Sequence, residues 1–484
     1  MHPLLLFLPV LVFTILSIWK GFKPAIGVTL FITIILFFVR GQTLILFFAA
    51  SIQSLIQSYN IFALIFGALF LYYVLEKTKL SQKLALSLES LHPSREVRFF
   101  LISMILTVFF EGIVGFGLPG VIVPVILRLL GFNIYHSIAT VLLFDATYVT
   151  LGALGTPVNI GLVSPLQLTS ESSRSIAFYA TSISGIAGLS ILWSTFYLYE
   201  KFEKTKMTFK TKILGMYILS FMTMVFLAYV AKELALIMTS FVMLMYAYFF
   251  IHKGHSKLQL APWTPYLILT ICIILQNFLF TYVFKDFASI SVTNILGTKI
   301  SATATFLATP LISFFIVGSF YLFYKKESPK MYLKPLASSI FLFFKIFPVF
   351  LFTSLLMAEN GTGPSMIQEM NVYIMSIGGP LPLFTSTFGM FGAYLTGAAT
   401  TTNILMGPII YYMSDVFHHN KELMLGSLTT GGAFGNAICF FNIIVACSFL
   451  KIKDSHKVLH LTFLPTITAT AIAGLLTFSL QFFL

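Results

Sequence analysis

The sequence is dominated by long apolar stretches that contain almost no charged side chains. Residues 213–230 and 339–357 are two examples. A run of about 20 such residues is long enough to cross the hydrocarbon core of a bilayer as a helix. Inside lipid no water is available to bond the backbone, so only helices and closed barrels can cross. These runs lack the alternating pattern of barrel strands. The sequence therefore predicts an all-α polytopic membrane protein.

The composition agrees with this class and excludes several others. Only 9% of the 484 residues are charged and 58% are hydrophobic, whereas a soluble domain carries about a quarter charged residues. The net charge of +13 comes from basic residues in short connections, which is typical of cytoplasmic loops rather than of nucleic-acid binding. Cys272, Cys439 and Cys447 lie in apolar surroundings and indicate neither a disulfide framework nor a metal site. No motif of an enzyme or an ATP-driven pump is present, so we expect no catalytic residues and no cofactor.

About 12–14 membrane segments can be marked by length and hydropathy. The regular spans are expected at residues 3–19, 24–39, 60–75, 175–199, 213–230, 234–251, 264–284, 302–324, 336–357 and 459–484. Segments interrupted by Gly, Pro, Thr and Asn are 42–57, 99–130, 135–163, 378–412 and 423–449. The first span lacks a preceding basic residue and a cleavage site, so we expect it to be retained. All the basic connections can be cytoplasmic if both termini lie outside and 42–57 does not cross or is re-entrant.

The two halves of the chain show the same order of pieces. We expect a first repeat at 1–205, with a hairpin at 99–130 and a broken helix at 135–163. Connecting helices follow at 206–258. A second repeat at 259–484 has a hairpin at 378–412 and a broken helix at 423–449. The polar segment before the first hairpin is basic, whereas its counterpart at 358–377 is acidic. This change of sign predicts inverted repeats, and matched interrupted segments indicate a transporter's binding site.

The four interruptions predict a site for a small organic anion. A helix that starts at a break directs free N–H groups and a partial positive charge towards the cavity, and a carboxylate fits that arrangement. Thr and Asn side chains beside the breaks can also bind a substrate hydroxyl. Small residues in membrane helices can instead serve close helix packing, which is the alternative for any single glycine. The candidate substrate-binding residues are Gly115, Phe116, Gly117, Gly155, Thr156, Thr400, Thr401, Thr402, Asn403, Gly432, Asn436 and Asn442.

Two carboxyl groups within the membrane segments are candidates for carrying a coupling proton. Glu111 starts the first break, and Asp145 lies inside an apolar stretch. A charged carboxylate at mid-bilayer costs about 2.5–3.5 kcal/mol on insertion scales, so its presence suggests a functional role. The alternatives are pairing with a basic neighbour such as Arg128, or capping of a broken helix. Lys345 could attract the anion, although we expect it to extend towards the interface.

The interrupted segments resemble those of the lactate permease family, bacterial carriers of lactate and glycolate. The similarity is carried by Glu111-Gly-Ile-Val-Gly-Phe-Gly117, Gly152-Ala-Leu-Gly-Thr-Pro157, Thr396-Gly-Ala-Ala-Thr-Thr-Thr-Asn403, and Gly435-Asn436 with Asn442 and Ala446-Cys447. The resemblance implies uptake of a 2-hydroxymonocarboxylate, driven by protons, across a bacterial inner membrane. It also suggests re-entrant hairpins and elevator motion. The chain departs from the family pattern at Tyr148, Ala398, Ala399, Phe440 and Phe441, which could alter the preferred monocarboxylate.

Two other hypotheses remain open from the sequence. The first is a sodium-coupled carrier of a dicarboxylate or another anion. Thr and Asn side chains, together with backbone carbonyls of an unwound helix, can also bind Na⁺. A non-transporting membrane protein is the other, and it would require a catalytic constellation or a soluble interaction domain. The expected partners are the anion, the coupling proton or Na⁺, and the lipid bilayer. The sequence leaves open whether the protein is a monomer or a homodimer.

Overall fold

The computed structural model shows a helical protein made of two compact units. The first unit comprises residues 1–84 and 259–376, and the second comprises 85–258 and 377–484. Each unit thus takes one segment from each half of the sequence. The structure describes residues 3–20, 22–80, 83, 92–113, 115, 117–163, 166–251, 264–284, 290–304, 311–326, 333–358, 365–366, 369–370 and 380–483.

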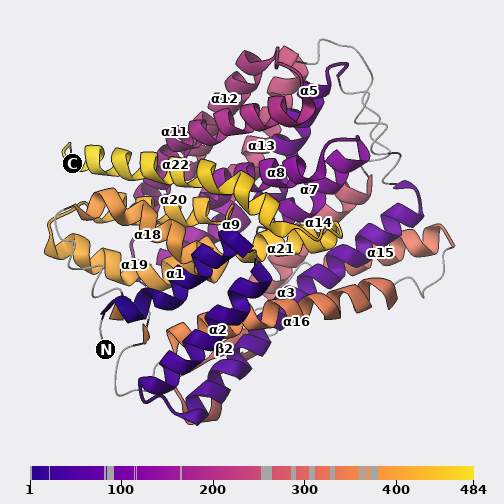
Figure 1. Ribbon diagram of the computed structural model, residues 1–484. Helices are drawn as coiled ribbons and strands as arrows, with labels where there is room; N and C mark the ends of the chain where they lie inside the picture. Colours follow the sequence, from indigo (N-terminus) through magenta and orange to yellow (C-terminus); the bar gives the residue numbers. More distant parts are fainter. Residues whose placement is uncertain are drawn as a thin grey trace. The chain divides into compact units, whose positions relative to one another are not determined.

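The first unit contains six helices and a short sheet within its described residues (Figure 1). Its helices are α1 (Pro3–Lys20), α2 (Phe22–Val39), α3 (Leu44–Lys77), α14 (Thr264–Phe278) with a π-helical continuation (Leu279–Val283), α15 (Leu311–Tyr324) and α16 (Leu333–Met357). Strands β1 (Ile290–Val292) and β2 (Ala302–Ala304) pair antiparallel, with Ile290 opposite Ala304, and a 3-10 turn (Ile295–Gly297) lies between them. Apolar side chains from α2, α3 and α16 and from the sheet region form a common core.

Two expectations for this unit are wrong. Segments 42–57 and 60–75 were expected to be separate, yet α3 is one continuous 34-residue helix. Its polar residues do not interrupt it, because the hydroxyls of Ser54 and Ser58 donate to carbonyls one turn back, at 2.6 and 2.7 Å. The span expected at 302–324 also begins later than predicted. Residues 302–304 form β2, and the helix α15 starts at Leu311.

The second unit contains the interrupted segments. Its first-half elements are α5 (Arg95–Leu101), a π-helical stretch (Ile102–Leu106), α6 (Thr107–Ile113), α7 (Leu118–Leu129), α8 (Ile134–Tyr148), a 3-10 turn (Val149–Leu151), α9 (Gly152–Val158), a π-helical stretch (Asn159–Val163), α11 (Ser170–Glu203), α12 (Lys210–Val230), a 3-10 turn (Lys232–Leu234), and α13 (Ala235–Tyr246) with its π-helical end (Ala247–Ile251). Its second-half elements are α18 (Leu381–Thr396), α19 (Ala399–Val416), α20 (Lys421–Gly435), α21 (Phe440–Phe449) and α22 (Ser455–Gln481).

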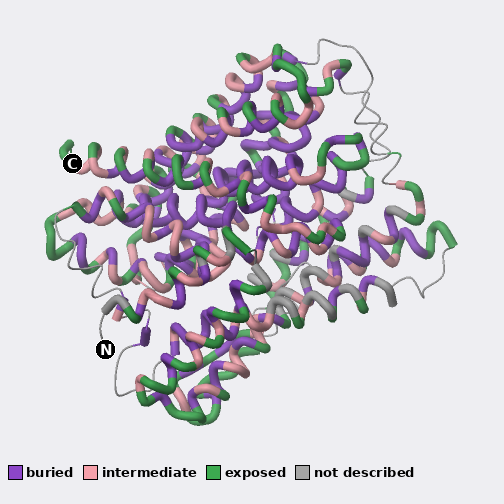
Figure 2. The backbone as a smooth tube through the Cα atoms, viewed as in Figure 1, coloured by how far each residue is buried: buried purple, intermediate pink, exposed green. Residues whose placement is uncertain are grey.

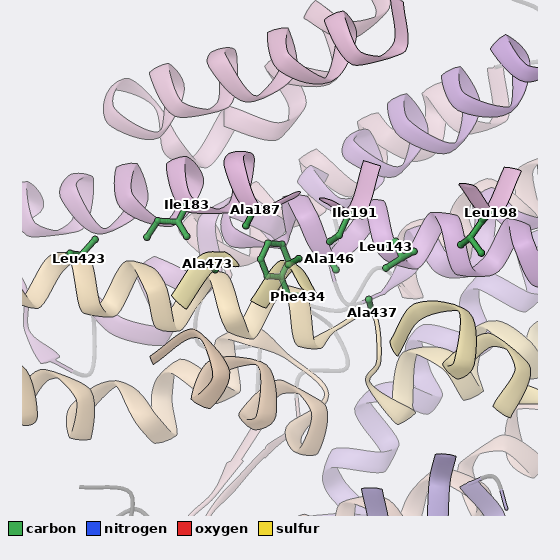
Figure 3. Close-up of a cluster of buried hydrophobic side chains, with 11 residues drawn as sticks. Leu143, Ala146, Ile183, Ala187, Ile191, Leu198, Leu423, Phe434, Ala437 and Ala473 are labelled. Atoms are coloured by element: carbon green, nitrogen blue, oxygen red, sulfur yellow. The ribbon is translucent and has the colours of Figure 1, made fainter. Parts of the chain in front are cut away.

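The core of the second unit joins helices from both halves of the sequence. Side chains of α8, α11, α20 and α22 meet in one apolar cluster, where Ala187, Phe434 and Ala473 are among the labelled residues (Figure 3). Every residue from Leu423 to Gly435 in α20 is buried, and this part of the unit is mostly purple in Figure 2. Lipid provides no hydrophobic driving force for helix association, so the helices are held by close packing. The small Ala side chains allow that close packing.

Six helical runs of the described chain are long and apolar enough to cross a membrane, and shorter apolar helices add to them. The prediction of an all-α, multi-pass membrane protein is therefore confirmed, with the small sheet of the first unit as an exception. The long runs are 134–163, 170–203, 210–230, 232–251, 421–449 and 455–481.

Candidate functional site

The first interruption separates α6 from α7. Gly115 and Gly117 have left-handed backbone conformations, with φ of 65° and 71°, which glycine adopts without the steric cost of a side chain. α7 then starts at Leu118 with Pro119 in its first turn, where the missing N–H of proline is not needed. The helix is thus broken where the sequence predicts. Phe116, between the two glycines, lies outside the described residues.

The second interruption follows α8. After the 3-10 turn at 149–151, Ala153, Leu154 and Gly155 are left-handed in succession, with φ of 45°, 58° and 78°. This conformation costs a residue with a side chain about 1–2 kcal/mol, so the surrounding contacts must hold the segment in place. The hydroxyl of Thr156 lies 3.5 Å from the carbonyl oxygen of Gly152.

The second half has two further interruptions. α18 ends at Thr396, and the following residue, Gly397, is left-handed with a φ of 84°. Ala398 is extended, and α19 begins at the next residue. α20 ends at Gly435, and a turn at 436–438 leads through Cys439 into α21. Figure 1 shows α18, α19 and α20 packed together around these short connections.

The first interruption contacts both the second and the fourth. A Cβ placed on Gly115 would lie 2.7 Å from the Cβ of Ala153. A Cβ placed on Gly117 would lie 2.7 Å from the Oδ1 of Asn442. Both distances are shorter than van der Waals contact, so the two glycines are required for these segments to approach so closely.

The third interruption contacts the second and the fourth. Val149, Ala399 and Ala433 form a small buried cluster that joins the second interruption, the start of α19 and α20. The Cβ position of Gly397 lies 3.6 Å from the Sγ of Cys439. It also lies 3.5 Å from the Cβ of Phe441. The four interruptions therefore form a closed ring of contacts, although they are far apart in the sequence.

A pair of buried carboxyl groups lies against this ring. Glu111 on α6 and Asp145 on α8 are 3% and 1% exposed, and their carboxyl groups are in hydrogen-bonding contact with each other. Such a contact requires at least one proton, because an ionised carboxylate only accepts. A Cβ on Gly152 would overlap the Oε1 of Glu111. The pair is thus directly adjacent to the start of the second interruption.

The proposed alternative pairing of Asp145 with Arg128 is not formed. Arg128 donates instead to the carbonyl oxygen of Leu450, at 3.2 Å. No ion pair to either Glu111 or Asp145 is present within the described residues. The Oε2 of Glu111 and the Oδ1 of Asp145 have no hydrogen-bond partner in the described part of the chain. These atoms are available to a proton, a water molecule or a substrate.

Asn403 ties the second interruption to the second half. Its side-chain amide donates to the carbonyl of Pro157 and to the hydroxyl of Thr429, both at 2.9 Å. Its Oδ1 is buried without a partner in the described chain. The same is true of the Oδ1 of Asn436, whose backbone carbonyl accepts from the Asn442 side chain at 3.1 Å. Asn442 therefore closes the turn of the fourth interruption and contacts the first.

The three threonines at the start of α19 differ in their surroundings. The hydroxyl of Thr402 donates to the carbonyl of Ala398 at 3.0 Å and lies 3.1 Å from the hydroxyl of Thr396. Thr400 and Thr401 are half-buried, and their hydroxyls have no hydrogen-bond partner among the residues that the structure describes. These two hydroxyls, at the N-terminal turn of the helix, are free to bind a ligand.

The packing explanation holds for some glycines and not for others. Cβ atoms on Gly431 and Gly435 would overlap the backbone carbonyls of Ser386 and Met390 on α18, so these glycines permit close helix packing. Gly432 is different, because its Cβ position is 3.3 Å from Ala399 at the tip of the third interruption. It faces the ring. Gly155 is buried, and its Cβ position faces the Asn159 amide at 3.4 Å.

Three residues of the site were not predicted from the sequence. Gly152 provides the close approach of Glu111, Thr429 accepts from Asn403, and the carbonyl of Pro157 accepts from the same amide. Gly152 and Pro157 lie in the quoted stretch Gly152-Ala-Leu-Gly-Thr-Pro157, and Thr429 lies in the interrupted segment 423–449, so the signal was present. Their roles depend on tertiary contacts that a spacing pattern does not contain. The side chain of Lys345 lies outside the described residues.

Comparison with known proteins gives consistent matches. A model of the L-lactate permease family matches residues 1–484. The L-lactate permease of Halalkalibacterium halodurans is 21% identical over 462 residues, covering 88% of this chain and 86% of that protein. The L-lactate permease of Escherichia coli is 21% identical over 463 residues, covering 86% and 83%. The putative L-lactate permease of Haemophilus influenzae is 23% identical over 192 residues, covering 38% of this chain and 36% of that protein.

Proposed function

Because the chain belongs to the L-lactate permease family, we propose that it is a secondary active transporter that takes up a small 2-hydroxymonocarboxylate by proton symport. Family membership supports lactate transport across a membrane, and the proposal adds the coupling ion, the substrate range and the site. The substrates would be L-lactate, with D-lactate or glycolate as further candidates. The membrane would be a bacterial inner membrane.

The observation that carries the proposal is the ring of four interruptions with a carboxyl pair beside it. In the first interruption the left-handed Gly117 directly precedes the start of α7. In the third interruption one residue, Ala398, separates the left-handed Gly397 from the start of α19. The free N–H groups of such starts favour a carboxylate. The hydroxyls of Thr400 and Thr401 are at the start of α19 and could bind the substrate's 2-hydroxyl. The polar groups thus match a molecule with a carboxylate and an adjacent hydroxyl.

The carboxyl pair would carry the coupling proton. Two carboxylates in contact cannot both be ionised at low cost, so a shared proton is the stable arrangement. Glu111 contacts Gly152 at the start of the second interruption. Gain or loss of the proton would therefore change the contacts of a segment that belongs to the ring. This gives a physical link between the proton and the substrate site.

The architecture proposed from the sequence belongs to the same hypothesis. Residues 1–205 and 259–484 would be two inverted repeats joined by 206–258. Each repeat would supply a re-entrant hairpin and a broken helix to the site. In the structure both pairs occur in one unit, as α6–α7 with α8–α9 and as α18–α19 with α20–α21. All these elements belong to one chain, so the proposal is compatible with a monomer and with a homodimer.

The proposal can be tested in proteoliposomes containing the purified protein. Uptake of labelled L-lactate should rise with an inward proton gradient, collapse with an uncoupler, and stay unchanged when choline replaces sodium. Glu111→Gln and Asp145→Asn should abolish gradient-driven uptake, while Asp415→Asn, on the surface pair with Lys421, should not. Sodium-dependent uptake of succinate without lactate uptake would support the sodium-coupled alternative and contradict the proposal.

A further inference from the structure

Most buried threonines of this protein bond their own helix, and Thr107 does not. The hydroxyl of Thr147 on α8 donates to the carbonyl of Leu143 at 2.7 Å, and that of Thr181 on α11 donates to the carbonyl of Ala177 at 2.8 Å. Both acceptors lie one turn back in the same helix. Thr107 is 0% exposed, yet its hydroxyl has no hydrogen-bond partner among the described residues. A buried hydroxyl without a partner lowers stability, so its position needs an explanation.

The π-helical stretch at 102–106 accounts for this difference. It ends directly before Thr107, whose backbone N–H bonds the carbonyl of Met104, three residues back instead of four. The carbonyl of Ser103, which a threonine hydroxyl at residue 107 would reach in a regular α-helix, is therefore not in its usual place. π-helical turns are rare and occur often at functional sites. The irregular turn leaves the hydroxyl of Thr107 available to another group.

The side chain of Glu111 extends towards that hydroxyl. Thr107 and Glu111 are four residues apart in α6, so they lie on the same face, with about 5–6 Å between their Cβ atoms. A helical side chain also leans over the turn that precedes it. In the structure the Glu111 carboxyl is bonded to Asp145. Its Oε2 has no partner in the described chain, so it is not yet bonded to Thr107.

Loss of the proton from the Glu111–Asp145 pair would change this arrangement. Two ionised carboxylates in contact repel each other, so the Glu111 carboxylate would turn away from Asp145. A buried carboxylate is stable only where donors bond it. The Thr107 hydroxyl can donate such a bond, and it lies one turn back along the direction in which the Glu111 side chain leans.

No charged group besides Asp145 acts on Glu111 within the part of the chain that the structure describes. The π-helical stretch and α9, which pack against α6, have no titratable residue. The titratable side chains of its other neighbours, α7, α8 and α13, have contacts elsewhere. They are Arg128, which donates to the Leu450 carbonyl; Tyr135, beside Lys457; His136, stacked on Phe99; Tyr148, bonded to Ser220; and Tyr246, beside Gly215. Hydrogen bonds therefore decide how stable the ionised pair is.

Two other buried threonines near the pair have no partner in the described chain, and neither is placed as well as Thr107. Thr140 precedes Asp145 by five residues, so it points to a different side of α8. Thr150 belongs to the 3-10 turn, which packs mainly against α11 and α20. Thr107 is the one that shares a helix face with Glu111.

We propose that Thr107 is a positioning residue for proton coupling: its hydroxyl donates to the Glu111 carboxylate once the pair has lost its proton. The bond stabilises the ionised pair and so sets the pH at which the proton is released. Thr107 keeps its own proton throughout, so the step needs no further acid or base. The inference rests on the proposed proton symport, because a coupled carrier must release the proton in every cycle.

Infrared difference titration of the purified full-length protein in liposomes tests the proposal. The carboxyl absorption that is lost in Glu111→Gln with Asp145→Asn belongs to the pair. Thr107→Val removes the donor at nearly constant volume, so the ionised pair is less stable. The midpoint of the titration should therefore rise by about one pH unit, which is a tenfold higher proton affinity. Thr107→Ser keeps the hydroxyl and should keep the wild-type midpoint.

Thr181→Val is the matched control, because it removes a buried hydroxyl that bonds its own helix. It should leave the midpoint unchanged. If Thr107→Val does not fold, Thr107→Ala is the second variant, and the same rise is expected. An unchanged midpoint in a folded Thr107 variant would overturn the proposal, and so would a rise in Thr150→Val in its place.

Uptake of labelled L-lactate by the same liposomes separates this inference from the proposed function. Proton-driven uptake by the wild type, together with an unchanged midpoint in Thr107→Val, would refute only the role of Thr107. A wild type that takes up no lactate under a proton gradient would refute the symport itself, and with it any coupling role of this residue.

Discussion

At the residue scale, the contact between Glu111 and Gly152 links proton chemistry to backbone geometry. The Glu111 carboxyl lies where a side chain at residue 152 would be, and the left-handed segment begins at the next residue. A dry interior strengthens electrostatic interactions and raises the cost of an unpaired charge. A change of protonation at the pair with Asp145 would therefore act directly on the adjacent turn.

Gly152→Ala tests this link. The added Cβ would overlap Glu111 Oε1, and overpacking of this kind costs about 1–3 kcal/mol. We expect proton-driven lactate uptake to fall about tenfold or more in proteoliposomes. Glu111→Asp, which is shorter by one methylene, should restore part of the uptake in the Gly152→Ala background. Gly27→Ala is the control, because its Cβ meets nothing within 4 Å.

Asn403 gives a second prediction at this scale, which concerns stability. Asn403→Ala removes two hydrogen bonds, to Pro157 and Thr429, and each is worth about 1 kcal/mol with a further cost for partners left unpaired. We expect a lower melting temperature in detergent. Thr429→Val removes one of these bonds and should cause a smaller decrease. Strict additivity in the double variant would contradict a direct interaction, because residues in contact are expected to couple.

At the element scale, glycines in α20 have two separate roles that one sequence pattern conceals. Gly431 and Gly435 allow α18 to pack against α20, whereas Gly432 faces the third interruption at Ala399. Neighbouring positions on a helix point in different directions. Substitution of adjacent glycines should therefore affect different properties of the protein.

Gly431→Ala and Gly432→Ala separate these roles. The first would place a Cβ on the Ser386 carbonyl, so we expect poor yield and a large loss of thermal stability. The second meets Ala399 at 3.3 Å, which a small shift can relieve, so the protein should fold. Its lactate KM should change because the start of α19 moves. Comparable melting temperatures for the two variants would count against this assignment.

The sequence predicted the interruptions well, because Gly and Pro act locally on the backbone. Gly115, Gly117 and Gly397 are left-handed, and they lie inside the segments 99–130 and 378–412 that the sequence marks as interrupted. The continuity of α3 was not predicted, since Ser54 and Ser58 bond their own helix and this cannot be told from a polar break. The closure of the ring depends on contacts over long sequence distances. Such contacts leave no periodic signal.

At the scale of the whole molecule, the central hypothesis is that the two halves have opposite orientations in the membrane. α11 follows the broken helix of the first half, and α22 follows that of the second. The basic cluster around Lys206 follows the end of α11, whereas the cluster around Lys453 precedes the start of α22. If basic connections stay in the cytoplasm, the two helices must cross in opposite directions.

Cysteine labelling in intact cells decides this point. In a background with Cys272, Cys439 and Cys447 replaced by Ser, Gln167→Cys before α11 should react with a membrane-impermeant maleimide, and Lys206→Cys after it should not. For α22 the order should reverse: Lys453→Cys protected and Phe483→Cys labelled. Disrupted cells, in which all sites should react, provide the control for accessibility. Labelling of Gln167→Cys together with Lys453→Cys would mean parallel halves. In that case matched interruptions would not face the site from opposite sides, and the inverted-repeat hypothesis would have to be abandoned.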